Sequence, residues 1–106
     1  TAFYAHRIRE NTEWIRNMTD SLGEKVYISF DVDAFDPSLV PATGTPEPGG
    51  FFWHDVMAAL KGLAKSEKQV VGCDVVELAP IKGMHAPDFT VAKLVYAMIG
   101  LCAAPN

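Results

Sequence analysis

The sequence predicts an α/β fold with three layers, in which a central parallel sheet lies between two layers of helices. Hydrophobic periodicity orders the chain as helix, strand, helix, strand and helix. The two expected strands, residues 25–30 and 69–76, are almost wholly apolar, which is typical of strands buried on both faces of a parallel sheet. A strand–helix–strand connection of this kind forms a right-handed parallel crossover.

The first expected helix covers residues 11–22. Its apolar residues recur on one face, Asn11 is positioned to cap its start, and Gly23 is positioned to end it. The strand over residues 25–30 follows directly, and Ser29 is its only polar residue after Lys25. A long loop over residues 31–50, rich in Pro and Gly, separates this strand from the next helix.

The second half of the chain repeats the strand and helix signals. We expect a helix over residues 53–66, with one apolar side, and the second strand over residues 69–76. A Pro/Gly loop over residues 78–87 precedes the last helix, residues 88–102, which the Pro87-Asp88 pair opens.

Two strands are too few for a stable parallel sheet, because each strand needs neighbours and both faces need cover. The last helix is apolar nearly all round, so it needs burial on more than one side. We therefore expect residues 1–106 to be the C-terminal part of one larger domain; heavy oligomerisation is the alternative. The chain also begins at Thr1 rather than Met, which fits a piece of a longer protein.

Charge and hydropathy argue against two classes of partner, nucleic acids and membranes. A net charge of −4 with scattered basic residues argues against nucleic acid as a partner. No signal peptide and no apolar span of membrane length is apparent, so we expect a cytoplasmic protein that does not contact a membrane. Cys73 and Cys102 lie far apart in the sequence in apolar surroundings and are expected to be buried free thiols rather than a disulfide.

The chemistry-bearing feature is the pair Asp31 and Asp33, directly after the first strand. If the strand persists, the two side chains share a face, with Cα atoms roughly 6.6 Å apart from a rise of ~3.3 Å per residue. Carboxylates so placed suit a site for two hard cations such as Mn²⁺ or Mg²⁺. The alternative is that they only cap the next turn, but two like charges at a buried strand end then repel without compensation.

Other acids divide between structural and binding roles. Asp36 precedes Pro37, so it is expected to start a turn. Glu77 follows the second strand at the same sheet edge as the aspartate pair, where it could bind a guanidinium; an ordinary exposed glutamate is equally compatible with the spacing. Asp74 lies inside the strand and is expected to support a ligand or a backbone group.

The histidines and two other Asp-x-Asp hypotheses add little. His6, His54 and His85 have no metal-ligand spacing and are expected on the surface or in loops. An EF-hand is excluded because Phe35 stands where an oxygen ligand is required. A nucleotide-sugar transferase remains a distant alternative, since no segment that could cradle phosphates accompanies the triplet.

Three segments resemble the ureohydrolase family of arginases and agmatinases. SFDVDAFDPSLVPATGTPEPGG resembles that family's second metal-binding signature, VVGCDVVELAP its next strand, and HAPDFTVAKLVYAMIG its C-terminal helix. The likeness covers roughly residues 25–100, and in the first segment the Asp triplet, Asp-Pro, Thr-Gly-Thr-Pro and double Gly occur in register.

The resemblance implies an arginase-like three-layer fold and two Mn²⁺ ions bridged by a hydroxide that attacks a guanidinium carbon and releases urea. It assigns Asp31 and Asp33 as metal ligands, Glu77 as the carboxylate that binds the guanidinium, and Thr45 as a residue that approaches the substrate. It also implies a homo-oligomer, a trimer or hexamer. The loop would form a wall of the pocket, stiffened by its prolines, with Gly49 and Gly50 permitting unusual backbone angles.

Part of the family pattern is missing from this chain. The G-G-D-H and D-A-H-x-D segments, which carry the other metal ligands, and the proton-shuttling histidine do not occur here. The resemblance is therefore to the last third of an agmatinase-like enzyme that converts agmatine to putrescine and urea. Arginase, guanidinobutyrase and formimidoylglutamase are alternative activities, and a truncated non-catalytic scaffold is a rival of another class. We expect the 106 residues alone to bind Mn²⁺ weakly and to be inactive.

Overall fold

A computed structural model describes residues 1–104 of the chain. Its elements are α1 (Ala5–Ile8), α2 (Trp14–Ser21), β1 (Lys25–Asp31), the 3₁₀ turn η1 (Val32–Ala34), α3 (Trp53–Lys65), β2 (Gln69–Val76) and α4 (Ala86–Ala103). The predicted order of the larger elements is confirmed, and the bounds of β2 agree with the prediction; α1 was not predicted.

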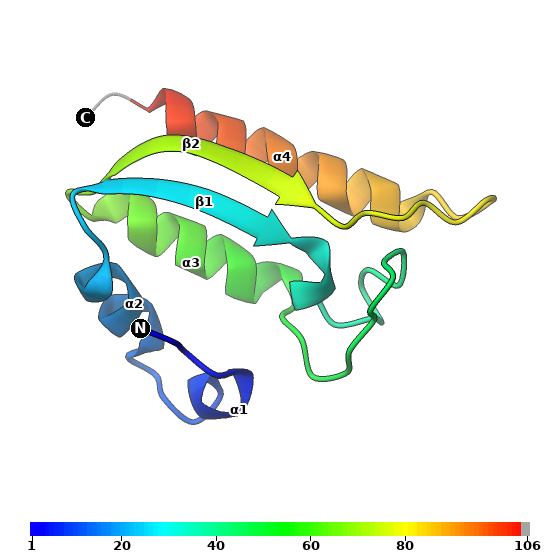
Figure 1. Cartoon of the computed structure of the whole chain (residues 1–106), viewed down its shortest axis with the longest axis horizontal. Coiled ribbons are helices and arrows are strands. Elements are labelled where there is room, and N and C mark those ends of the chain that lie inside the picture. The colour runs from blue at the N-terminus through cyan, green and yellow to red at the C-terminus, as the bar shows by residue number, and fades with distance from the viewer. Residues whose placement is uncertain (105–106) are drawn as a thin grey trace.

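The strands β1 and β2 are parallel neighbours, joined by the crossover through α3. The register pairs Ser29 with Asp74 and Asp31 with Val76, so both strands end at the same edge of the sheet. In Figure 1 both arrowheads point to the end of the molecule where the two long loops lie. The expectation that the strand ends share an edge is confirmed.

A β-bulge interrupts the register near the start of the pair. Val26 pairs with Val70 and Tyr27 with Gly72, so Val71 is left without a partner on β1. Gly72 leaves room for the Tyr27 ring, since a Cβ at this position would be 2.9 Å from Tyr27 Cε2 and the exposed ring would have to move.

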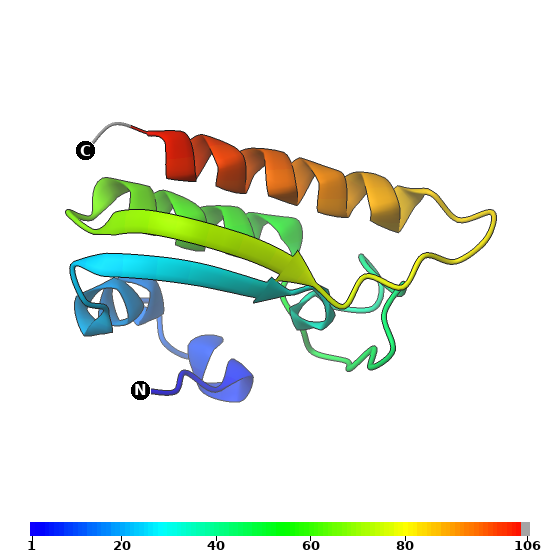
Figure 2. The same ribbon diagram turned by 45° about the horizontal axis from the view of Figure 1, so that its top comes forward.

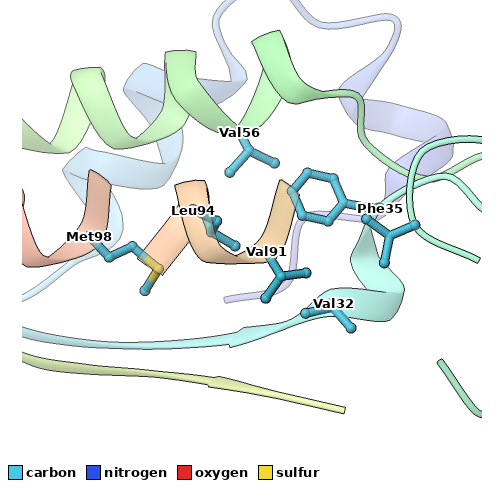
Figure 3. Packing of buried hydrophobic residues seen from close by; sticks show 7 residues of the cluster. Val32, Phe35, Val56, Val91, Leu94 and Met98 are labelled. Carbon is cyan, nitrogen blue, oxygen red and sulfur yellow. The ribbon is translucent and has the colours of Figure 1, made fainter. Parts of the chain in front are cut away.

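Helices cover one face of this two-stranded sheet. The core joins α3, α4 and the segment after β1 with the inward side chains of the strands, as Figure 3 shows for Val32, Phe35, Val56, Val91, Leu94 and Met98. On the opposite face Tyr27 is 59% exposed. Figures 1 and 2 show α3 and α4 beyond the sheet, with no helix over its near face. Within residues 1–104 the three-layer arrangement is therefore present as two layers, and the expected burial of both strand faces is wrong for this part of the chain.

Helix α2 packs on α3, but its ends differ from the prediction. Ile15 of α2 lies so close to Gly62 of α3 that a Cβ on the glycine would overlap it. Asn11 does not cap the helix; its Oδ1 accepts a hydrogen bond from Glu13 N at 2.9 Å, and the helix begins after Glu13. At the other end Leu22 is already extended, so the chain leaves the helix before Gly23 and no left-handed glycine is needed.

Helix α4 contradicts the expectation that no apolar span of membrane length exists. By length and composition alone this helix of 18 residues is apolar enough to cross a membrane. Its Val91, Leu94 and Met98 are buried against the sheet, but only 22% of the helix is buried within residues 1–104. Its opposite side exposes Phe89, Tyr96 and Ile99, in keeping with a helix that is apolar all round.

Candidate active site

Asp31 and Asp33 lie at the carboxyl end of β1, but not on one extended strand. The strand ends at Asp31, and the chain turns at once into η1. Asp31 Oδ1 accepts a hydrogen bond from Asp33 N at 3.1 Å and so caps this turn. The strand does not persist through Asp33, and the Cα separation expected for an extended pair therefore does not apply.

Each of the two carboxylates keeps one oxygen free of protein hydrogen bonds. Asp33 Oδ2 accepts from Thr45 Oγ1 at 2.5 Å, while Asp31 uses Oδ1 for the turn. Among residues 1–104, Asp31 Oδ2 and Asp33 Oδ1 have no hydrogen-bond partner, and neither carboxylate has an ion-pair partner. Both residues are half-buried. Two half-buried carboxylates thus lie two residues apart at the strand end, each with one oxygen available to a ligand within residues 1–104.

The loop that carries Thr45 is closed and tied down at its base. Asp36 N donates to Phe51 O and Phe51 N donates to Ala34 O, both at 2.8 Å, so the loop ends run side by side. Gly50 permits this approach, because a Cβ there would lie 2.5 Å from Asp36 N. Arg9, which no sequence motif singles out, donates from Nη2 to the carbonyl oxygens of Gly49 (3.1 Å) and Gly50 (2.9 Å).

Asp36 has the turn-forming role that its place before Pro37 predicts. Its Oδ1 accepts from Ser38 Oγ at 2.6 Å and Ser38 N at 3.0 Å, and its Oδ2 accepts from Gly49 N at 3.1 Å. The Ser38 hydroxyl, followed by these backbone donors, lowers the pKa of Asp36 below its ordinary value. Gly49 adopts a left-handed φ of 85°, as expected of this glycine pair.

Glu77 is the first residue after β2, and its backbone is strained. Its φ is 69°, a left-handed value that is uncommon for residues other than glycine. The residue before it, Val76, pairs with Asp31, so Glu77 lies at the same sheet edge as the aspartates. The side chain is exposed. The next loop is fixed by a hydrogen bond from Ala79 N to Ala42 O at 2.8 Å, which joins it to the loop of Thr45.

Within residues 1–104, Asp74 bonds two side chains of the neighbouring strand rather than a backbone group, and its predicted support of a ligand stays a prediction. Its Oδ2 accepts from Tyr27 Oη at 2.9 Å and its Oδ1 accepts from Ser29 Oγ at 2.8 Å, both on the neighbouring strand. The bond to Asp74, with burial as a smaller cause, raises the pKa of the Tyr27 phenol. This cross-strand group could not be found from sequence because it depends on the register after the bulge.

The histidines are not grouped with Asp31 and Asp33 at the sheet edge. His6, His54 and His85 are exposed, as expected, and residues 1–104 contain no group of three or more His, Cys, Asp or Glu side chains that could hold a metal. A cavity of about 490 Å³ lies between the N-terminal segment and the end of the loop, against Arg9, Trp14 and Phe51; it reaches Ala34, next to Asp33, but neither aspartate lines it. Within residues 1–104 the aspartate pair therefore lacks the further side chains that a complete metal site needs.

Comparison with known proteins identifies the family of the chain. A model of the arginase family matches residues 1–100. The chain belongs to the arginase family. The arginase-family chain is 48% identical to an N(1)-aminopropylagmatine ureohydrolase of Thermus thermophilus, over 93% of its own length and 33% of the relative's. It is 41% identical to the agmatinase of Pyrococcus horikoshii, over 94% of its own length and 35% of that protein.

Solved structures agree on the fold. The agmatine ureohydrolase of Thermoplasma volcanium superposes with a TM-score of 0.77 at 32% identity, over 92% of this chain and 33% of that one. The arginase of Bacillus caldovelox also superposes with a TM-score of 0.77, at 25% identity, over 97% of this chain and 35% of that one. The arginase-like α/β fold class is confirmed. This arginase-family chain spans about one third of the length of the curated relatives that it matches. The names of these relatives support hydrolysis of guanidino substrates as the chemistry of the family.

Proposed function

We propose that residues 1–106 form the C-terminal part of a Mn²⁺-dependent ureohydrolase that cleaves a guanidino amine, agmatine or a close derivative, to urea and the free amine. One observation carries the proposal: two half-buried carboxylates, which have no cationic partner among residues 1–104, lie beside Glu77 at one sheet edge. This edge is where open α/β sheets bind ligands.

The carboxylates fit a hard divalent cation. Asp31 Oδ2 and Asp33 Oδ1 are the oxygens left available for it among the described residues. Bound manganese supplies Lewis-acid activation of a water for attack on the guanidinium carbon. Thr45 fixes one oxygen of Asp33 and so orients the other. The remaining ligands would come from parts of the protein outside residues 1–106, since the described part holds no complete set.

Glu77 would bind the substrate cation. A guanidinium presents parallel N–H donors, and one carboxylate accepts two of them in a fixed plane. The left-handed backbone at Glu77 supports this role, because strain of this kind persists at positions where a side chain must be held in a particular direction. The carboxylate would thereby orient the guanidinium carbon toward the metal-ligand pair.

The substrate proposal rests on the relatives. Their names are N(1)-aminopropylagmatine ureohydrolase and agmatinase, both referring to agmatine or an agmatine derivative. Agmatine has no α-carboxylate, so an enzyme specific for it needs no cationic group for that end of the substrate. Arginine is the competing substrate, because arginases share the fold at similar TM-scores.

We extend the proposal to assembly and location: a cytoplasmic homo-oligomer, trimer or hexamer, in which buried surface covers part of α4. The exposed Phe89, Tyr96 and Ile99 support such an interface. The isolated chain would bind Mn²⁺ weakly and release no urea. Tight binding of two ions to the purified 106 residues, measured by isothermal titration, would contradict this division of the site.

The test uses the longer protein that carries this segment, loaded with Mn²⁺. Urea release is measured from agmatine, N(1)-aminopropylagmatine and arginine. We expect kcat/KM to be higher for agmatine and N(1)-aminopropylagmatine than for arginine. Asp31→Ala should lose both metal and activity.

Glu77→Gln should retain metal while kcat/KM falls by about 100-fold or more, as expected for loss of a charged hydrogen-bond pair of about 3 kcal/mol. Asp74→Asn is a matched control, since that carboxylate bonds only Tyr27 and Ser29 among the described side chains. An Asp31→Ala variant that keeps metal and turnover would refute the proposal.

A further inference from the structure

The two cysteines, far apart in sequence, lie side by side in the fold. Cys73 is in the middle of β2 and Cys102 in the last turn of α4, 29 positions later. The Cys102 thiol donates a hydrogen bond to Cys73 Sγ at 3.4 Å, and both thiols are free and half-buried. The sequence predicts free thiols but not their contact.

The packing of α4 holds this pair together. Leu94 and Met98, fully buried, anchor the helix on the sheet just before its last turn. The register places Cys73 opposite Ile28, on the side of the sheet that faces the core. A disulfide needs about 2 Å between the sulfurs, so small side-chain rotations would suffice for a bond between these two residues.

The two thiols are both half-buried, but Cys102 and not Cys73 borders a cavity. This cavity of about 600 Å³ lies at the end of the sheet opposite the candidate active site and is also lined by Leu63, Ser66 and Leu101. Burial, followed by the hydrogen bond from Cys102, raises the pKa of the Cys73 thiol. The raised pKa disfavours Cys73 as the first nucleophile, and a small oxidant that enters the cavity meets Cys102 first.

We propose that Cys73 and Cys102 form a peroxide-reactive dithiol that closes to an intramolecular disulfide between β2 and α4. The oxidant is hydrogen peroxide or an alkyl hydroperoxide. The Cys102 sulfur attacks one peroxide oxygen, the O–O bond breaks, and Cys102 becomes a sulfenic acid as water (or the alcohol) leaves. Cys73 sulfur then attacks Cys102 sulfur, and a second water leaves as the S–S bond forms. Two thiols are oxidised and one peroxide is reduced.

The bond would fix the end of α4 to the strand that leads to Glu77. It would also close a loop of about 29 residues in the unfolded chain, so the oxidised protein should unfold at a higher temperature than the reduced protein. This modification is independent of the proposed hydrolase activity, and its test needs neither metal nor substrate.

The experiment treats the longer protein that carries this segment with hydrogen peroxide in the presence of dimedone, which traps sulfenic acids. Mass spectrometry then compares the Cys73–Cys102 disulfide with the trapped adduct, once in buffer and once in concentrated urea. Because the fold holds the sulfurs in contact, we expect the ratio of disulfide to adduct to be at least about tenfold higher in buffer. The adduct should map to Cys102, and Cys73→Ser should raise its yield.

Three results would overturn the proposal. One is an equal ratio in buffer and in urea; another is linkage only between separate chains; the third is a dimedone adduct on Cys73 alone. The conservative variants Cys73→Ser and Cys102→Ser differ by one atom from the native residues, so the fold should persist, and a circular dichroism spectrum of each checks this. Oxidation should raise the melting temperature of the native chain and leave that of both variants unchanged.

Discussion

Phe35 anchors the segment that carries the aspartate pair, and its replacement by alanine is the most direct test of the packing. Phe35 lies two residues after Asp33 and is 0% exposed. Its ring stands 5.2 Å from that of Phe30, at 48°, and it belongs to the cluster shown in Figure 3. Phe89 of α4 provides a matched control, because the same side chain is 67% exposed there.

The expected losses differ because burial differs. Removing a fully buried phenylalanine costs about 3–5 kcal/mol, from lost transfer free energy and the cavity left behind. Complete native domains have a total free energy of unfolding of about 5–15 kcal/mol, and a chain with a two-stranded sheet should lie at or below the lower end, so Phe35→Ala should remove most of it. In a chain kept dilute enough to be monomeric, where the proposed α4 interface is not formed, Phe89→Ala should change stability by less than about 0.5 kcal/mol, since it leaves no cavity and alanine is the better helix former.

The assay is urea denaturation followed by circular dichroism at a helix wavelength. With an m-value of about 2 kcal/mol per molar urea, Phe35→Ala should lower the midpoint by roughly 1.5–2.5 M, while Phe89→Ala shifts it by no more than about 0.3 M. The reasoning is refuted if the two variants have the same midpoint, or if Phe35→Ala costs less than about 1 kcal/mol. Either result would mean that the segment after β1 does not pack as described.

Three further predictions concern the site and its surroundings. Glu77→Gly should raise the free energy of unfolding by about 1 kcal/mol over Glu77→Ala, because glycine relieves the left-handed backbone; equal urea midpoints would contradict this. Asp36 has a pKa lowered by Ser38, so it stabilises the fold above its unfolded pKa of about 3.9, and this contribution disappears as the pH falls through the lower folded value. Between about pH 5 and pH 2, melting temperatures should therefore fall further for the native chain than for Asp36→Asn, and parallel curves would argue against the role. Tyr27 should ionise above the ordinary tyrosine range, and Asp74→Asn should lower its pKa; ultraviolet titration, with Tyr27→Phe to assign the transition, measures the shift.

The sequence predicted the main elements well, because hydrophobic periodicity is a local property of the chain. The apolar run of Gln69–Val76 and the one-sided pattern of Trp53–Lys65 each corresponded to one observed element. Element ends were less accurate. Asn11 was expected to cap α2, but its carboxamide oxygen bonds Glu13 N in the turn before the helix. Propensities of single residues do not decide between such neighbouring arrangements, since both satisfy the same backbone groups.

The candidate site was predictable in its residues but not in its contacts. Asp31, Asp33 and Glu77 could be selected because acids at the ends of apolar strands are costly without a partner. Their roles as metal and substrate ligands stay predictions. The bond from Thr45 to Asp33 joins positions 12 residues apart through a loop whose path no local rule gives.

By itself, the sequence determined which segments are helices and strands, which residues follow each strand, and the family to which these segments belong. Only the tertiary structure decided the long-range contacts: the hydrogen bond of Arg9 to the loop, the contact of Cys73 with Cys102, and the hydrogen bonds that Asp74 accepts from Tyr27 and Ser29. It also decided that one face of the sheet is exposed in residues 1–104. The physical reason is the sequence separation over which each kind of interaction acts. Backbone preference and side-chain period act over a few residues, whereas these contacts join positions 29 to 47 apart and follow from strand register and helix packing.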